Sequence, residues 1–166
     1  MPVGVTRGEL LSCCASTRWA ESVAAAGPFV SWDDLAAHAL TALATLEWGD
    51  VLEALDAHPR IGDRDPGPER EAAWSRQEQA GVAGAADDTL RTLAAGNAQY
   101  ERRFGHVFLI CAAGKSAGAM LAELGDRLDH SPVVEREVVR AELAAITRLR
   151  LRKLAEAHLE ASGSTP

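Results

Sequence analysis

The sequence predicts an all-α fold, a single-domain bundle of about eight helices with one buried extended segment near 106–112. Three observations lead to this prediction. Residues that begin or end helices recur along the chain, alanine-rich stretches favour helix throughout, and a single run has the composition of a strand. A chain of 166 residues is long enough to bury a core as one domain, 1–166, with a frayed tail expected at 162–166.

Near the amino terminus, two hydroxyl residues predict helix starts. Thr6 and Ser31 are each followed three residues later by an acid, which is the capping-box pattern, and each precedes an apolar-periodic stretch. Gly27-Pro28 and Gly49 are read as helix-stop signals. Helices are therefore expected to begin after Thr6 and after Ser31, and to end at Gly27-Pro28 and near Gly49.

The middle of the chain is expected to contain a short helix, a loop and a second helix. The short helix, from about Val51 to Ala57, must end near His58, because Pro59 disfavours helical geometry in the residue before it. The run 63–68 is rich in turn-forming residues, and 69–81 is expected to be helical again because no strong helix breaker interrupts it. His58 is thus placed at the exit of a helix.

The second half of the chain is predicted to hold three helices and the extended segment. A long helix is expected over 87–103. The strand-like run 104–112 follows it and has no partner strand elsewhere, so a buried extended segment is favoured over a sheet. Helix resumes over 116–128, and Ser131-Pro132 opens the longest helix, with proline at the first helical position.

Composition limits the classes of partner and compartment. With 47% hydrophobic and 25% charged residues, the chain is typical of globular proteins. The net charge of −7 argues against nucleic acid or an anionic membrane as a partner. The amino terminus lacks the pattern of a secretory leader, so a cytoplasmic protein is expected. The three cysteines lack metal or redox spacing and are expected to be free thiols.

A permanent charge interrupts the apolar face of the last helix. Val139, Leu143, Ile146 and Arg150 are spaced by four, three and four residues and so share one face. Arg148 projects to the opposite side. Arg150 is therefore either a structural arginine that reaches the rim or pairs with an acid, or a clamp for an anion, since a guanidinium group matches a carboxylate.

A second polar group lies on the helix expected over 69–81. Ser75, Glu78 and Gln79 share one face of it. Taken alone, this is an ordinary exposed polar face, and His58 is an ordinary helix-end histidine. Taken together, they fit the edge of a pocket, because a carboxylate near an imidazole orients it for acid/base chemistry. Spacing in the sequence leaves open whether these residues meet.

Five separated motifs, in order along the chain, resemble the 2-oxo-4-hydroxy-4-carboxy-5-ureidoimidazoline (OHCU) decarboxylase family. The motifs are His58 to Gly62, Ser75 to Gly81, Asn97 to Tyr100, Arg103 to Ala112, and Ile146 to Leu151. The resemblance extends to Cys14 and Trp19, so it covers nearly the whole chain. It implies an all-helical lyase that breaks a carbon–carbon bond, releasing (S)-allantoin and carbon dioxide in the third step of urate oxidation in purine catabolism.

The resemblance also implies roles for particular residues. His58 and Glu78 correspond to the catalytic pair of the family, and which of them delivers the final proton is left open. The expected substrate contacts come from Pro59, Ser75, Gln79, the backbone of Ile110 and Ala112, and Arg150. The resemblance further implies an enzyme without cofactor or metal, usually a homodimer, whose substrate is a small anion.

One position departs from the family pattern. Animal relatives tend to carry an arginine directly after the Cys-Ala pair, where this chain has Ala113-Gly114-Lys115. That contact is either lost or taken over by Lys115. Two other classes of function remain as alternatives: a non-catalytic helical interaction module, which needs no pocket, and a small metal-dependent hydrolase, for which the histidine spacing is poor.

Overall fold

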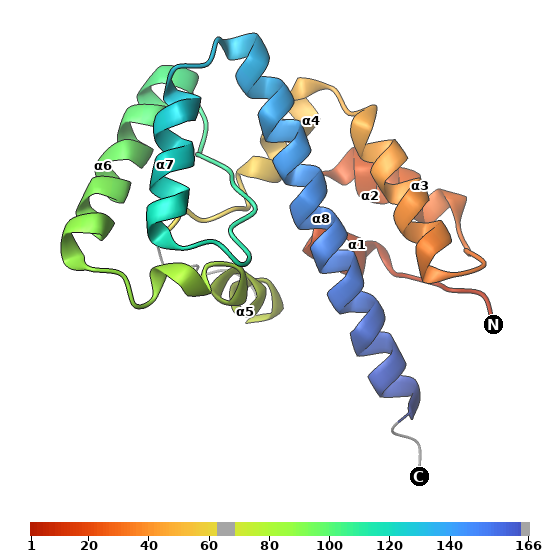
Figure 1. Ribbon diagram of the computed structural model, residues 1–166. Helices are drawn as coiled ribbons and strands as arrows, with labels where there is room; N and C mark the ends of the chain where they lie inside the picture. Colours follow the sequence, from red (N-terminus) through yellow and green to blue (C-terminus); the bar gives the residue numbers. More distant parts are fainter. Residues whose placement is uncertain (63–68, 164–166) are drawn as a thin grey trace. The chain divides into compact units, whose positions relative to one another are not determined.

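The computed structural model describes residues 1–62 and 69–163, and this part of the chain is all-α (Figure 1). The described elements are α1 (Arg7–Cys13), α2 (Thr17–Ala26), α3 (Trp32–Ala44), α4 (Trp48–Leu55), α5 (Glu69–Glu78), the 3-10 helix η1 (Ala80–Val82), α6 (Asp87–Phe104), α7 (Ala117–Leu128) and α8 (Pro132–Gly163). The predicted fold class is confirmed. The predicted loop at 63–68 lies outside the described residues.

The chain forms two compact units. The first comprises Met1–Ala54 and the chain from Ala144 onward, and the second comprises Leu55–Leu143. Helix α8 contributes its first residues to the second unit and the remainder to the first.

In the first unit, hydroxyl caps begin α1 and α3 as predicted. The Thr6 side chain accepts a hydrogen bond from the backbone N–H of Glu9 at 3.2 Å, and a Glu9 carboxylate oxygen accepts from the Thr6 N–H at 2.8 Å. Ser31 accepts from the Asp34 N–H at 3.1 Å, whereas the Asp34 carboxylate accepts from Val30 at 3.2 Å rather than from the cap residue. These bonds satisfy amides that a helix start leaves without partners.

One predicted boundary in the first unit is wrong, and another boundary was not predicted. Gly49 does not end a helix but lies inside α4. Helix α4 begins before it, because Asp50 and Val51 donate their N–H groups to the carbonyl of Glu47, and the preceding helix has already ended at Ala44. The start of α2 was not predicted from the sequence. There the Ser16 side chain accepts a hydrogen bond from the Trp19 N–H at 3.3 Å.

The predicted tail is also partly wrong. Ser162 and Gly163 belong to α8, and the Ser162 hydroxyl donates to the carbonyl of His158 at 2.9 Å, one turn earlier in the helix. The rest of that tail lies outside the described residues.

The core of the first unit forms around a tryptophan. Trp19 is fully buried on α2 and donates its indole N–H to the carbonyl of Ala39 on α3 at 2.8 Å. Burying an aromatic ring while satisfying its polar atom stabilises the contact between these two helices.

In the second unit, α6 and α7 pack side by side and run in the same direction, and the segment between them returns along their length (Figure 1). Residues 107–112 form neither helix nor strand, and Phe108, Leu109, Ile110 and Ala112 are buried. A buried extended segment was predicted near 106–112, and the burial and the absence of helix are confirmed for 107–112. Its neighbours include Tyr100 of α6, because Tyr100, Phe108, Ile110 and Ala112 belong to one hydrophobic core.

The other helix predictions for this unit differ little from the structure. The predicted start of α7 is confirmed, since the Ser116 hydroxyl accepts from the Ala119 N–H at 3.1 Å. Helix α5 ends at Glu78 rather than Gly81, and η1 continues from it.

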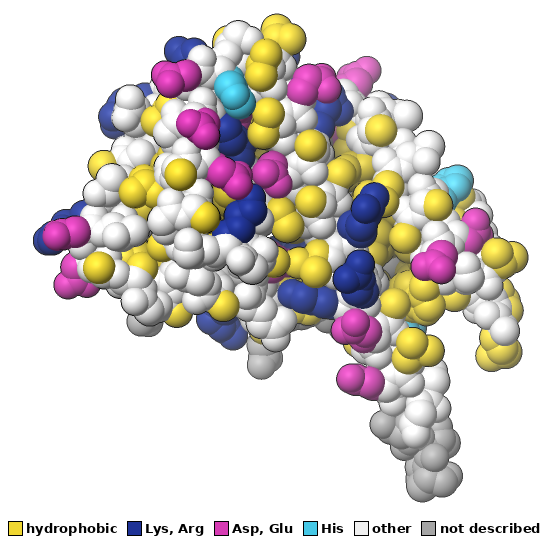
Figure 2. Space-filling view, in the orientation of Figure 1, with side chains coloured by type: hydrophobic (Ala, Val, Ile, Leu, Met, Phe, Trp, Pro, Cys, Tyr) yellow, Lys and Arg dark blue, Asp and Glu magenta, His cyan; other side chains and the backbone are white. Residues whose placement is uncertain are grey.

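The surface shown in Figure 2 carries acidic and basic side chains interspersed. Within the described ranges, no helix has both the length and the apolar character required to cross a membrane. The three cysteines are free thiols, as predicted, with Cys13 and Cys14 buried and Cys111 half-buried.

Candidate active site

The loop after α4 presents His58 and Pro59, both half-buried. The backbone N–H of His58 donates to the carbonyl of Leu55, the last residue of α4, at 2.9 Å. This bond, between residues three apart, forms one further turn after the helix and confirms that His58 lies at a helix exit.

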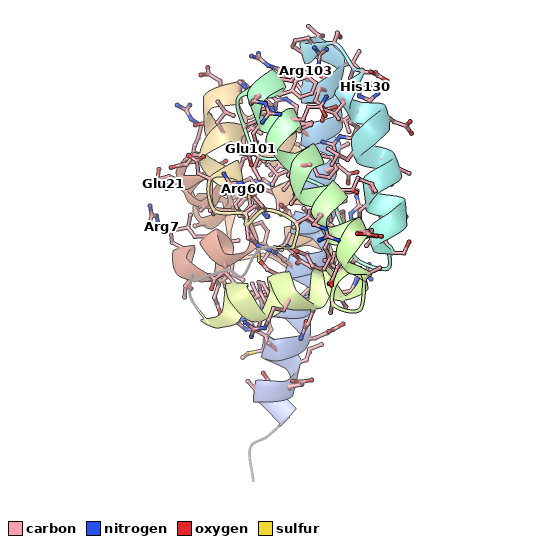
Figure 3. The ribbon with its side chains drawn as sticks, turned by 90° about the vertical axis from the view of Figure 1, so that its left-hand side faces the viewer. Arg7, Glu21, Arg60, Glu101, Arg103 and His130 are labelled. Carbon is pink, nitrogen blue, oxygen red and sulfur yellow. The ribbon has the colours of Figure 1, made fainter. Side chains whose placement is uncertain are left out.

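Two residues of α6, one turn apart, bind the backbone and side chains just after His58. The Asn97 amide donates to the carbonyl of Ile61 at 3.3 Å. The guanidinium of Arg60 makes two parallel hydrogen bonds to the Glu101 carboxylate, at 2.7 and 3.0 Å, and Figure 3 shows the two side chains beside each other. Paired bonds of this kind fix orientation as well as distance. Helix α6 thus positions the loop that carries His58.

The same loop is bonded to the end of α5. The side-chain carbonyl oxygen of Gln79 accepts from the Gly62 N–H at 2.9 Å. Gln79 was predicted to contact substrate. In the structure its side-chain oxygen is already hydrogen-bonded to the loop that carries His58.

Helix α5 buries the polar face that the sequence singled out. Ser75 is 5% exposed and Glu78 is 8% exposed, while Gln79 is half-buried. The interpretation of this face as an ordinary solvated one is wrong for Ser75 and Glu78. Carboxylates are rarely buried to this degree without a partner or a function.

A close backbone contact fixes the chain just after Glu78. A Cβ atom at Gly81 would lie 2.0 Å from the carbonyl oxygen of Lys115. Only glycine allows η1 to lie this close to the turn at 112–115, in which the Lys115 N–H donates to the Ala112 carbonyl at 3.0 Å. The ammonium group of Lys115 itself pairs with Glu123 of α7.

This contact gives a prediction about stability. Gly81→Ala is expected to lower the free energy of unfolding by about 1–3 kcal/mol, the usual cost of overpacking, because the new methyl group meets backbone that cannot rotate away. Gly84→Ala is the matched control, since nothing lies within 4 Å of a Cβ at that position. Thermal unfolding of the two variants measures the difference, and equal melting temperatures would contradict the close approach.

Electrostatics also relates Glu78 to the buried segment. Burial raises the pKa of the Cys111 thiol, and the negative charges of Glu142 and Glu78 raise it further. The Glu78 carboxylate therefore lies within electrostatic reach of Cys111, which is flanked by the two predicted backbone contacts, Ile110 and Ala112.

Arg150 lies in the first unit, on α8. It is 6% exposed, whereas Arg148 is exposed, so the predicted helical phase is confirmed. One guanidinium nitrogen donates to the carbonyl of Ser12 at 3.4 Å. Burial raises the pKa of the Cys14 thiol to about 11, although the positive charge of Arg150 acts in the opposite direction. Arg150 is thus a buried positive charge close to the Cys14 thiol.

Except for Arg150, the predicted site residues all belong to the second unit. Ile61 and Val82, which follow His58 and Glu78 in the chain, share one hydrophobic core with Ile110 and Ala112. Within 1–62 and 69–163, no group of three histidine, cysteine, aspartate or glutamate side chains is arranged to hold a metal ion. The arrangement combines an imidazole, a buried carboxylate and buried backbone, which can orient a small polar molecule and exchange protons with it.

Comparison with known proteins identifies the family of this chain. The model of the OHCU decarboxylase family matches residues 1–152. The chain belongs to the OHCU decarboxylase family.

Two curated relatives of this chain show how far the similarity extends. The uric acid degradation bifunctional protein TTL of Arabidopsis thaliana is 31% identical over 158 residues, which are 93% of this chain and 48% of that protein. The chain thus spans about half the length of the Arabidopsis protein. The 2-oxo-4-hydroxy-4-carboxy-5-ureidoimidazoline decarboxylase of Amia calva is 32% identical over 155 residues, or 90% of this chain and 85% of that protein.

A solved structure gives the same result for the fold. An OHCU decarboxylase crystallised in the presence of (S)-allantoin superposes with a TM-score of 0.77 at 32% identity, covering 89% of this chain and 97% of that one. The resemblance that the motifs indicated is confirmed.

Several residues that position this candidate site were missed by sequence reasoning. Asn97 and Glu101 could have been noticed, because they lie four residues apart on one helix, within or beside a family motif. Gly81 also closes a motif. Glu142 offered no such signal, since it contacts Cys111 across 31 residues of sequence.

Proposed function

We propose that this protein catalyses the cofactor-independent decarboxylation of OHCU to (S)-allantoin and carbon dioxide, the third step of urate oxidation. The observation that supports this activity most directly is the burial of the Glu78 carboxylate in a chain of the OHCU decarboxylase family. An exposed carboxylate would have no defined substrate to face, whereas a buried one beside the His58 loop can bind and orient a polar ring.

The chemistry needs orientation and proton transfer more than it needs a cofactor. Breaking the bond to the carboxyl carbon releases carbon dioxide, and the electron pair forms a carbon–carbon double bond. The pair of the neighbouring C=N bond moves to nitrogen, which takes up a proton. The enol-like intermediate then loses its hydroxyl proton and gains a proton on carbon, giving the carbonyl and C–H groups of allantoin. The substrate therefore supplies its own electron sink.

In this proposal each residue has a role matched to its chemistry. His58 exchanges a proton with the substrate hydroxyl or ring. Glu78 orients the imidazole and accepts hydrogen bonds from substrate N–H groups. Arg150 binds a carboxylate or carbonyl oxygen. The remaining contacts come from Pro59, Ser75, Gln79 and the backbone of Ile110 and Ala112.

The decisive experiment is optical. Urate is oxidised in the presence of the hydrolase that catalyses the second step of the pathway, and optical rotation is followed. The signal from (S)-allantoin should appear far faster when this protein is added. A fixed proton donor on one face of the intermediate should yield one enantiomer, whereas spontaneous decay gives both. An unchanged rate with racemic product would favour a non-catalytic interaction module, and activity abolished by a chelator would favour a metal-dependent enzyme.

The role of Arg150 gives a second prediction. Arg150→Lys keeps the charge but loses the planar pair of donors, so it should weaken substrate binding and slow turnover. Arg148→Lys, on the exposed side of the same helix, is the control and should change little. Steady-state kinetics of both variants make the comparison, and similar losses at the two positions would remove Arg150 from the site.

The proposal also includes the setting in which the enzyme works. The chain acts as one domain, forms a homodimer and functions in the cytoplasm. Sedimentation equilibrium of the purified protein tests the dimer, for which a monomer at micromolar concentration would be the contrary result. Cell fractionation tests the compartment.

A further inference from the structure

We propose that Glu142 is a positioning residue, which fixes the register of the backbone at Ile110 and Ala112 so that this backbone can bind substrate. The inference rests on the proposed function and adds to it a residue that contacts no substrate. It follows from the way in which the buried segment between α6 and α7 is bonded on one side.

The segment runs back along the length of α6 and α7 (Figure 1), as an extended chain does. In extended backbone, the N–H and C=O of one residue point to one side and those of the next residue point to the other. The polar groups of Leu109 and Cys111 therefore share one side, and those of Ile110 and Ala112 share the other.

Side chains from two helices bond to the Leu109 and Cys111 side. Arg127 of α7 donates to the carbonyl of Leu109 at 2.6 Å. The Cys111 N–H donates to a carboxylate oxygen of Glu142 on α8 at 3.2 Å. These two bonds, at alternate residues, set which side of the segment faces the helices.

The opposite side carries buried backbone N–H and C=O groups that lack a hydrogen-bond partner among the described residues. Ile110 and Ala112 are each 3% exposed. Within the part of the chain that the structure describes, no hydrogen bond involves the N–H or C=O of Ile110 or the N–H of Ala112. More than about 90% of buried backbone groups are paired in proteins. A neighbouring N–H and C=O on one edge of a strand match a ring amide or a urea group, which presents a C=O beside an N–H.

The two bonds on the helix side differ in what would follow from their loss. Arg127 is buried and also bonds to Glu135, and its guanidinium lies 4.6 Å from the centre of the Phe108 ring. Its removal would disturb the core. Glu142 is half-buried, and within the described residues its carboxylate bonds to the segment, at Cys111, and to no other element. Glu142 is therefore the position at which the register can be tested without loss of the fold.

Glu142→Ala removes the acceptor for the Cys111 N–H and should raise KM about tenfold, close to the value of one hydrogen bond. The kcat should change less than about threefold, because the backbone contact serves substrate and transition state alike. Glu142→Gln retains a carbonyl oxygen in the same place and should recover most of the lost affinity. Glu137→Ala, at an exposed acid of the same helix, is the matched control.

A merely structural role has a different signature. It would lower the fraction of folded enzyme, so kcat would fall while KM stayed constant, and the glutamine variant would share the melting temperature loss. Glu142→Asp, whose carboxylate is one methylene shorter, supplies a milder variant if the alanine protein folds poorly, and it should also raise KM.

The contact can also be read without turnover. The amide proton of Cys111 should shift in the NMR spectrum of Glu142→Ala and stay near its native position in Glu142→Gln. An unchanged KM in the alanine variant, or equal impairment of the alanine and glutamine variants, overturns the proposal. Loss of the proposed function is distinct, since it would show as an inactive wild-type protein.

Discussion

Replacing His58 with alanine is expected to abolish decarboxylation while leaving the fold intact. The imidazole is the side chain that most readily exchanges protons near neutral pH, and His58 is half-buried at a helix exit, where its removal leaves the hydrophobic core in place. Glu78→Gln is expected to reduce turnover by about a hundredfold or more, the range for a lost acid/base partner. Both are measured by the rate of formation of (S)-allantoin.

A control separates chemistry from folding. His38→Ala changes an exposed histidine of α3, whose ring contacts Phe29 in a tilted arrangement and which plays no part in the proposed site. It should retain full activity. If His58→Ala or Glu78→Gln kept a near wild-type rate with a normal circular dichroism spectrum, the proposed catalytic pair would be wrong.

The largest effect on stability is expected at Arg127. Arg127 and Glu135 form a buried ion pair in the second unit, with the Arg127 Nε donating to Glu135 at 2.8 Å. Tyr100 donates to the same carboxylate, and Nδ1 of His130 lies 3.0 Å from its other oxygen. Arg127→Met leaves the carboxylate buried without its cation and should cost about 3–5 kcal/mol. Urea unfolding measures the loss, with exposed Arg102→Met as the control.

The pH dependence of that loss has a definite sign. Burial opposes ionisation of Glu135, but hydrogen bonds from Arg127, Tyr100 and His130 outweigh it and keep the pKa below its usual range. The stabilisation is complete above the pKa of the unfolded state and is lost as the pH falls through the folded-state value. The gap in stability between wild type and Arg127→Met should therefore narrow below about pH 4, near the ordinary pKa of glutamate. A gap that stayed constant in acid would contradict this account.

The features that sequence predicted well are those with local causes. Thr6, Ser31 and Ser116 begin helices because a hydroxyl group satisfies amides three residues away. The burial of Arg150 followed from the fixed period of the helix. By contrast, the prediction from Gly49 was wrong, because a glycine can occupy the first turn of a helix, here one in which the Asp50 carboxylate accepts from the Glu47 N–H at 3.3 Å.

The features that sequence missed depend on contacts between distant residues. The close approach of Gly81 to Lys115 spans two elements that no periodicity relates. The bonds from Asn97 to Ile61 and from Glu142 to Cys111 join residues more than thirty positions apart. The roles of His58, Glu78 and the substrate contacts came from the family motifs and stay predictions.

The alternation of bonded sides along 107–112 has a consequence for changes in chain length. Alternate residues of the segment direct their backbone groups to opposite sides. Deleting one residue before Leu109 would therefore exchange the two edges, as a slip by one residue does in a strand. The backbone groups that now meet Arg127 and Glu142 would then lie on the edge proposed to bind substrate, and the two side chains would lose their partners. This connection should therefore reject single-residue insertions and deletions that the exposed turn around 83–84 accepts, although both are loops without regular secondary structure.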